Sequence, residues 1–219
     1  MNLEAGSKLL MIGDSITDCG RNWPVGESPF GGLGNGYVSL VDAALRGVYP
    51  EQGVRVVNMG VGGNTVRDLK ARWQTDVIAL QPDYLTIMIG INDVWRHFDQ
   101  PMVMESHVDA TTYHDTLLEL VSSTKAQVKR LFLLSPFYLE TNQTDPMRKM
   151  TDEYRALMQQ VAGEAKVDFV DVQADFDNVM KHLYTSSLSG DRVHPNLTGH
   201  GIIARAFLRH IEFDWAHQA

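Results

Sequence analysis

The chain has 219 residues, which is long enough for one domain with a substantial hydrophobic core. Its 19 basic and 27 acidic residues give a net charge of −8. That balance argues against nucleic acids and anionic membrane surfaces as partners, because binding to either needs clustered Lys and Arg.

The single cysteine, Cys19, excludes an internal disulfide and a cysteine-based zinc site. The first residues, MNLEAGSKLLMI, have no cationic region followed by the apolar core of a signal peptide. No apolar run approaches the roughly 18 residues that a membrane-spanning helix needs. We therefore expect a cytoplasmic protein.

Short apolar runs alternate with longer segments of helical periodicity. In chain order the pattern predicts a strand over residues 8–12, a helix over 37–46, a strand over 54–59, a helix over 65–80, a strand over 84–89, a helix over 108–128, a strand over 130–134, a helix over 151–164, a strand over 167–172 and a helix over 197–211. The strands are nearly continuous apolar runs, which is typical of parallel strands buried on both faces. Repeated βα units without a linker predict one doubly wound, three-layer α/β domain over residues 1–219.

Polar residues cluster directly after three of the predicted strands. Ser15 lies in GDSITD after the first strand, the stretch GVGGN (60–64) follows the second, and GIND (90–93) follows the third. Ligands of an open parallel sheet bind beyond the carboxyl ends of its strands. We therefore expect one site at this edge of the sheet.

The segment DRVHP, residues 191–195, supplies partners for Ser15. A serine hydroxyl is a weak nucleophile and needs a base, usually an imidazole that a carboxylate orients. Asp191 lies three residues before His194, so one turn can bring its carboxylate to Nδ1 and leave Nε2 facing a hydroxyl. Pro195 keeps His194 extended, on a loop before the last predicted helix. These residues predict a catalytic triad of Ser15, Asp191 and His194.

An acyl-transfer site also needs hydrogen-bond donors aimed at the developing oxyanion. The candidates are the Ser15 amide, a glycine amide of the stretch 60–64, and the side-chain amide of Asn92. A glycine suits this role because a residue without Cβ lets its N–H approach the substrate closely.

Four blocks of the sequence resemble those of the GDSL, or SGNH, hydrolase family. In chain order they read GDSIT (13–17), NMGVGGNT (58–65), GIND (90–93) and DRVH (191–194). The resemblance covers almost the whole chain. It implies a flavodoxin-like three-layer sandwich with a five-stranded parallel sheet, and ester hydrolysis without a metal or other cofactor by Ser15, Asp191 and His194. It also implies that the amide of Gly63 is an oxyanion donor, together with the Ser15 amide and Asn92.

The segment GINDVWR (90–96) and the overall length of the chain are similar to those of bacterial carbohydrate acetylesterases, including the acetylxylan esterases of bacilli. This likeness implies a serine esterase that removes acetyl groups from sugar hydroxyls, with small acetylated xylo-oligosaccharides as the expected substrate. Gly190 departs from the family, in which a bulkier and often aromatic residue precedes the triad Asp. A glycine there is expected to loosen the loop, which bears on the level of activity and not on the reaction class.

Trp23, Trp95 and Arg96 lie near the predicted site loops and are candidates for a sugar-binding mouth or for packing. The tail FDWAHQA, residues 213–219, suits either a homo-oligomer contact or a frayed end.

Other functions fit parts of the same pattern. Within the family these are a lipase, a thioesterase or a short-chain alkyl esterase. A metal-dependent phosphoesterase is a different class, favoured by five metal-compatible residues: Asp14, Asp18, Asn92, His194 and His200. The D-x-H, GD-x-x-D and GNH elements of that class are missing, so we predict no metal site. A third interpretation is a non-catalytic carbohydrate-binding relative whose triad loop has degraded at Gly190.

Overall fold

The computed structural model describes residues 1–27 and 30–218, so Ala219 at the end of the predicted tail contact lies outside the described residues. One sheet of parallel strands has the order β2-β1-β3-β4-β5. The strands are β1 (Lys8–Gly13), β2 (Arg55–Gly60), β3 (Tyr84–Met88), β4 (Arg130–Leu134) and β5 (Asp168–Val170). All five predicted strands are confirmed, with ends shifted by at most about two residues.

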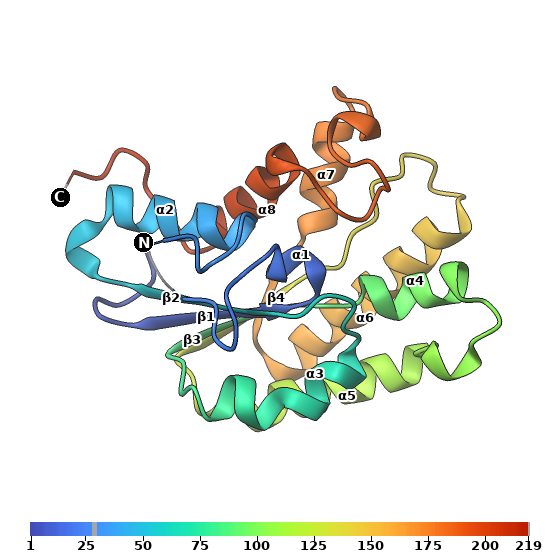
Figure 1. Cartoon of the computed structure of the whole chain (residues 1–219), viewed down its shortest axis with the longest axis horizontal. Helices are drawn as coiled ribbons and strands as arrows, with labels where there is room; N and C mark the ends of the chain where they lie inside the picture. The colour runs from blue at the N-terminus through green and yellow to red at the C-terminus, as the bar shows by residue number, and fades with distance from the viewer. Residues whose placement is uncertain (28–29, 219) are drawn as a thin grey trace.

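Helices cover both faces of the sheet, which gives the predicted flavodoxin-like three-layer architecture (Figure 1). On one face lie α2 (Tyr37–Val48), α7 (Val172–Met180) and α8 (Leu197–His210). On the other lie α3 (Val66–Trp73), α5 (Ala110–Thr124) and α6 (Pro146–Ala165). Shorter helical turns are α1 (Ser15–Asp18), Pro50–Gln52, Gln74–Ile78, Met104–Ser106 and Thr185–Ser187, and α4 (Ile91–Asp99) follows β3.

The five predicted helices are confirmed, but α1, α4 and α7 were not predicted. The first turn of helix α4 contains the polar pair Asn92 and Asp93, which by sequence is typical of a turn. Helix α7 begins two residues after β5 ends, so its first residue, the apolar Val172, extends the apparent strand. Helix α6 begins five residues earlier than predicted, because the Asp145 carboxylate accepts a hydrogen bond from Arg148 N (2.9 Å) and Pro146 occupies the first helical position.

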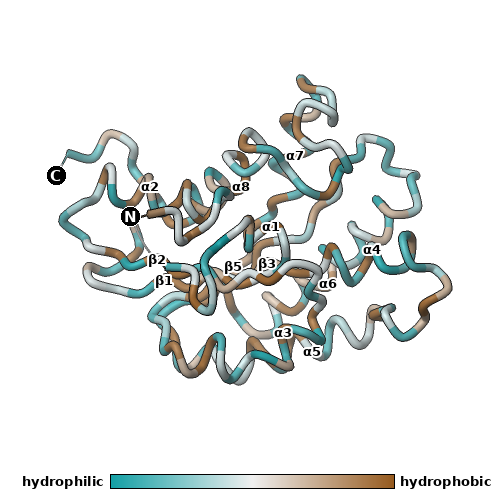
Figure 2. Tube along the Cα trace, in the orientation of Figure 1, coloured by the Kyte–Doolittle hydropathy of each residue, from teal (hydrophilic) through white to brown (hydrophobic). Residues whose placement is uncertain are grey.

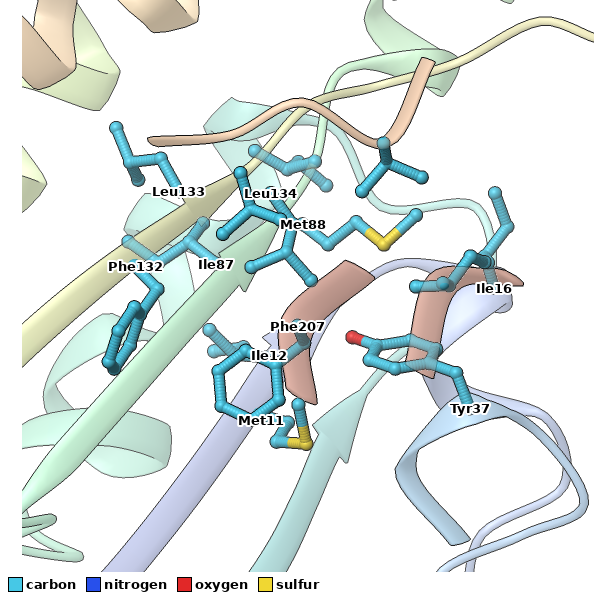
Figure 3. Packing of buried hydrophobic residues seen from close by; sticks show 14 of the residues in the cluster. Met11, Ile12, Ile16, Tyr37, Ile87, Met88, Phe132, Leu133, Leu134 and Phe207 are labelled. Atoms are coloured by element: carbon cyan, nitrogen blue, oxygen red, sulfur yellow. The ribbon is translucent and has the colours of Figure 1, made fainter. Parts of the chain in front are cut away.

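The core is built from the strands and the helix faces turned toward them. Ile12, Ile87 and Leu133 lie opposite one another on neighbouring strands, so their side chains share one face of the sheet. Phe132 points to the other face, where its ring meets that of Phe207 of α8 edge-on at 5.4 Å between centroids (Figure 3). Apolar segments gather along the central strands, whereas the outer loops are largely hydrophilic (Figure 2). Burial of this apolar surface is the main contribution to stability.

The ends of three strands meet at one edge of the sheet. Gly13 at the end of β1 lies opposite Gly60 of β2 and Met88 of β3. The segments that follow these strands therefore start side by side, at the edge where the sequence predicts the site. No helix among the described residues is long and apolar enough to cross a membrane.

Candidate active site

Ser15, His194 and Asp191 form one hydrogen-bonded chain. Ser15 Oγ lies 2.9 Å from His194 Nε2, and His194 Nδ1 lies 2.6 Å from Asp191 Oδ2. An ionised carboxylate can only accept, so Nδ1 carries the proton and Nε2 is left to accept from the serine hydroxyl. The side chains of His194 and Asp191 are each 44% exposed, so these hydrogen-bonded groups are accessible to solvent.

The turn that carries Ser15 is fixed by short contacts on both sides. Asp14 caps α1, its carboxylate accepting a hydrogen bond from Ile16 N (2.9 Å), and burial raises the pKa of Asp14 to about 7. Gly60 packs directly against the turn, because a Cβ there would stand 2.1 Å from Asp18 N. The end of β2 can therefore pack this closely against the Ser15 turn only because residue 60 is glycine.

Neighbouring residues of its own loop donate hydrogen bonds to the carboxylate of Asp191. Asp191 Oδ1 accepts hydrogen bonds from Ser189 Oγ (3.0 Å), Val193 N (2.9 Å) and His194 N (2.8 Å). Partial burial raises the pKa of Asp191, but these hydrogen bonds and the one from the His194 ring outweigh it and hold the pKa well below its ordinary value. The carboxylate is therefore ionised and held in one orientation beside Nδ1.

Asn92 and Gly63, the other two predicted oxyanion donors, follow the ends of β3 and β2. Asn92 Nδ2 donates to Asn64 O (3.0 Å), and Asn92 Oδ1 accepts from Arg96 Nη2 (2.9 Å). An amide nitrogen carries two hydrogens, so one remains for an acceptor in the site. Gly63 has φ +79, and a Cβ there would meet nothing within 4 Å, so the backbone conformation and not crowding favours glycine.

Arg72 of α3 joins the segments beneath the site, and its role was not predicted. Its guanidinium donates to Gly13 O (2.9 Å), Met59 O (2.8 Å) and Asn64 Oδ1 (2.7 Å). It also pairs with Asp76 at 2.7 Å. The sequence has no signal for this role, because the acceptors come from three separate segments.

Asp93 is a second buried carboxyl group, next to Asn92 at the start of α4. Its Oδ1 accepts a hydrogen bond from Val66 N, the first residue of α3, at 2.9 Å. Its Oδ2 is buried without a hydrogen-bond partner among the described residues. Burial raises the pKa of Asp93 to about 7, and the nearby charge of Asp14 adds to the rise.

The three candidate mouth residues take different places. The Trp95 ring lies 5.7 Å from the His194 ring, centroid to centroid, so Trp95 adjoins the triad. Arg96 donates a hydrogen bond to Asn92 Oδ1 and forms an ion pair with Asp99. Trp23 is 63% exposed, and its ring packs on the Arg21 guanidinium at 4.1 Å.

The metal-compatible residues do not gather into a ligand set. Within residues 1–27 and 30–218, no three His, Cys, Asp or Glu side chains are grouped to hold a metal ion. His200 accepts a hydrogen bond from Tyr37 N at Nδ1 (3.2 Å), and its Nε2 lies 3.2 Å from Cys19 Sγ. Burial, helped by the nearby charge of His194, lowers the pKa of His200 to about 4.

Gly190 leaves room for a larger residue. It is exposed, a Cβ there would meet nothing within 4 Å, and its φ lies outside the left-handed region. Nothing in the surrounding contacts requires glycine at this position.

Comparison with known proteins adds close relatives. The chain is 56% identical to the acetylxylan esterase of Geobacillus stearothermophilus over 98% of both chains. The crystal structure of that esterase matches with a TM-score of 0.98, at 55% identity over 100% of both chains. An alpha/beta hydrolase enzyme from the metagenome of Lake Arreo, Spain, is 50% identical over 97% of this chain and 98% of its own, with a TM-score of 0.96.

Variants of the Geobacillus esterase bear on the same positions. Crystal structures of S15A, D191A and H194A are described as catalytic mutants of that enzyme. Another variant replaces a tryptophan by isoleucine at the position of Gly190, so that relative carries the aromatic residue that this chain lacks.

The family model of the GDSL-like lipases and acylhydrolases matches residues 11–202, a span that holds the Ser15 turn, the Gly63 loop, Asn92 and the Asp191–His194 loop. With a match over most of its length, the chain belongs to the GDSL-like lipase/acylhydrolase family.

Proposed function

We propose that the protein is a serine esterase that removes acetyl groups from the hydroxyls of small acetylated xylo-oligosaccharides. The observation that carries the proposal is the unbroken hydrogen-bonded chain from Ser15 Oγ through His194 to Asp191. It is supported by the Geobacillus acetylxylan esterase, whose catalytic mutants fall at the same three positions.

In the proposed mechanism, Ser15 Oγ attacks the acetyl carbonyl carbon while His194 Nε2 takes the hydroxyl proton. The carbonyl oxygen becomes an oxyanion and accepts from the amides of Ser15 and Gly63 and from Asn92 Nδ2. His194 then gives its proton to the sugar oxygen, which leaves, and an acetyl-serine remains. A water that His194 deprotonates attacks this ester, and acetate departs as the proton returns to Ser15 Oγ.

Asp191 has a supporting part in this reaction. Its carboxylate holds the His194 ring with Nε2 toward Ser15 and stabilises the imidazolium that forms. Because its pKa lies well below the ordinary value, Asp191 remains ionised at every pH at which the esterase would work.

Two alternative functions have weaker support. A metal-dependent phosphoesterase needs clustered ligands, whereas Asp14 is buried as a helix cap and His200 is engaged by Tyr37 and Cys19. A non-catalytic sugar binder would need a broken triad loop, yet Asp191 keeps its hydrogen bonds with glycine before it. A lipase, thioesterase or alkyl esterase shares the proposed chemistry and differs only in substrate.

The proposal extends to organisation and location. We take residues 1–219 as one esterase domain, because the family model spans most of the chain and a single sheet organises it. We also propose a cytoplasmic location, which agrees with a single cysteine that cannot form an internal disulfide.

The first test is labelling with a serine-directed fluorophosphonate, followed by intact-mass measurement and mapping of the adduct. We expect one adduct on Ser15, and none in Ser15→Ala. Hydrolysis of p-nitrophenyl acetate should fall by about 10³-fold or more in Ser15→Ala and in His194→Ala. Wild-type turnover in Ser15→Ala would refute the assignment of the nucleophile. Release of acetate from alkyl esters but not from acetylated xylo-oligosaccharides would refute the substrate.

A further inference from the structure

A groove of about 350 Å³ lies between α4 and the segment that leads into α6. Three aromatic side chains line it, those of Trp95, Phe98 and Tyr138. Two carboxylates, Asp99 and Asp145, line it as well. Pro146 and Met147 complete the lining.

Residues on both sides of the groove contact the loop that carries His194. On the α4 side, the Trp95 ring packs against the His194 ring at 5.7 Å between centroids. On the other side, Leu139 N donates to Arg192 O (2.9 Å), and Arg192 Nη1 pairs with Glu140 at 2.6 Å. Trp95 therefore contacts the imidazole and also lines the groove.

The lining suits a neutral sugar. Aromatic rings pack on the apolar C–H face of a pyranose, and carboxylate oxygens accept hydrogen bonds from its hydroxyls. Phe98 is 37% exposed, so part of its side chain is open to a ligand. The groove lining includes two carboxylates and no Lys or Arg, although Arg96 pairs with Asp99 from the same helix. An anionic ligand would find no free cation in this lining.

The mechanism places the alcohol part of the ester on this side. His194 must protonate the leaving sugar oxygen, so the sugar lies within hydrogen-bond reach of Nε2. A sugar linked to that unit lies on the surface next to His194, where Trp95 brings the lining of the groove into contact with the imidazole.

We propose that this groove is a subsite for a second, neutral sugar unit, adjacent to the one that carries the acetyl group. The inference rests on the proposed function and adds chain-length selectivity to it. The esterase then acts on an oligosaccharide as such, and the reaction that supplies its substrate is the endo-cleavage of an acetylated, uncharged polysaccharide.

The test compares kcat and KM on acetylated xylose, acetylated xylotriose and p-nitrophenyl acetate, in the wild type, Phe98→Ala and Phe98→Tyr. Wild-type kcat/KM should be higher on acetylated xylotriose than on acetylated xylose. Phe98→Ala should lower kcat/KM on acetylated xylotriose by about 3- to 10-fold, mainly through KM. It should leave p-nitrophenyl acetate hydrolysis unchanged. Phe98→Tyr keeps the aromatic face and should behave as the wild type.

Asp145→Asn is an independent variant, because Asn can still cap α6 while the charge is lost. It should weaken discrimination against acetylated xylotriose that carries a uronic acid substituent. Equal kcat/KM on xylose and xylotriose esters, or equal losses on all substrates in Phe98→Ala, would overturn the subsite. The proposed function fails separately, through absence of the Ser15 adduct or of any acetate release by the wild type.

Discussion

Asp93 shows how a single buried carboxyl group makes stability depend on pH. Its Oδ1 holds the first amide of α3, while Oδ2 is buried without a partner in the described part of the chain. The pKa of Asp93 is raised from 3.8 to about 7, so the folded protein binds this proton more tightly than the unfolded chain. The resulting stabilisation is complete below pH 3.8 and is lost as pH rises toward 7.

We expect Asp93→Asn to remove this loss, because the amide cannot ionise and its Oδ1 can still accept from Val66 N. The free energy of unfolding of the variant, relative to the wild type, should rise between pH 5 and pH 8 by on the order of 1–3 kcal/mol. Urea denaturation at each pH measures it. Asp109→Asn is the control, because hydrogen bonds lower the pKa of Asp109 and it stays ionised over this range. Parallel curves for Asp93→Asn and the wild type would show that Asp93 is ionised when buried.

At the same scale, the sequence indicates residues whose partners are local or carry a recognisable pattern. Asp191 and His194 are three residues apart, and the structure joins them to each other and to Ser15. Ser189, two residues before Asp191, could have been found as a local side-chain contact of the same turn. Asp93 could not, because its partner Val66 and its burial depend on how α3 and α4 are placed.

At the scale of the elements, α3 joins the ends of β1 and β2 to the loop of Gly63, a proposed oxyanion donor. Arg72, whose side chain is only 15% exposed, donates to acceptors at the ends of β1 and β2 and to Asn64. Asn64 O in turn accepts from Asn92. One side chain therefore sets the spacing between the Ser15 turn and two proposed oxyanion donors.

We expect Arg72→Ala to lower kcat on p-nitrophenyl acetate by about 10- to 100-fold, with a smaller change in KM, because the oxyanion forms only after binding. Arg72→Lys should recover only part of kcat. An ammonium keeps the positive charge but cannot donate to all of these acceptors at once. Steady-state kinetics at a temperature well below Tm gives the comparison. Arg209→Ala is the control, since its pair with Asp175 lies at the surface. A lower Tm with unchanged kcat would mean that Arg72 only stabilises the fold.

The elements that the sequence predicts are those with long or continuous apolar patterns. The strands and α2, α3, α5, α6 and α8 follow from their periodicity. Helices α1, α4 and α7 are short, and they begin with Ser15, Ile91 and Val172, directly after or close to a strand end. Their helical character depends on caps and on packing against neighbours, which a short apolar pattern does not reveal.

At the scale of the whole molecule, the two ends of the proposed triad come from opposite ends of the sequence. Ser15 follows the first strand, and His194 precedes the last helix. His200 of α8 bridges this separation, since it accepts from Tyr37 N of α2 and contacts Cys19, where α1 ends. Tyr37 also reaches the nucleophile turn through its hydroxyl, 3.0 Å from Thr17 Oγ1.

The contacts of His200 with Tyr37 and Cys19 should weaken at acidic pH. The pKa of His200 is lowered from 6.5 to about 4, so the unfolded chain takes up the proton first as pH falls. Stability is therefore lost between pH 6.5 and pH 4, by about 2–3 kcal/mol for a group that is only 4% exposed. We expect His200→Asn, whose Oδ1 can accept from Tyr37 N without becoming charged, to lose less stability over this range in urea denaturation.

Asp14 and Asp93 act in the opposite direction over the same range, so the sign of the total change in the wild type does not identify His200. The difference between the wild type and His200→Asn does, because the contributions of the two carboxyl groups are common to both. His182→Asn, at an exposed histidine, should follow the wild type. An identical slope for His200→Asn and the wild type would contradict the prediction. A shallower slope would show that protonation of His200 accounts for part of the loss of stability at acidic pH.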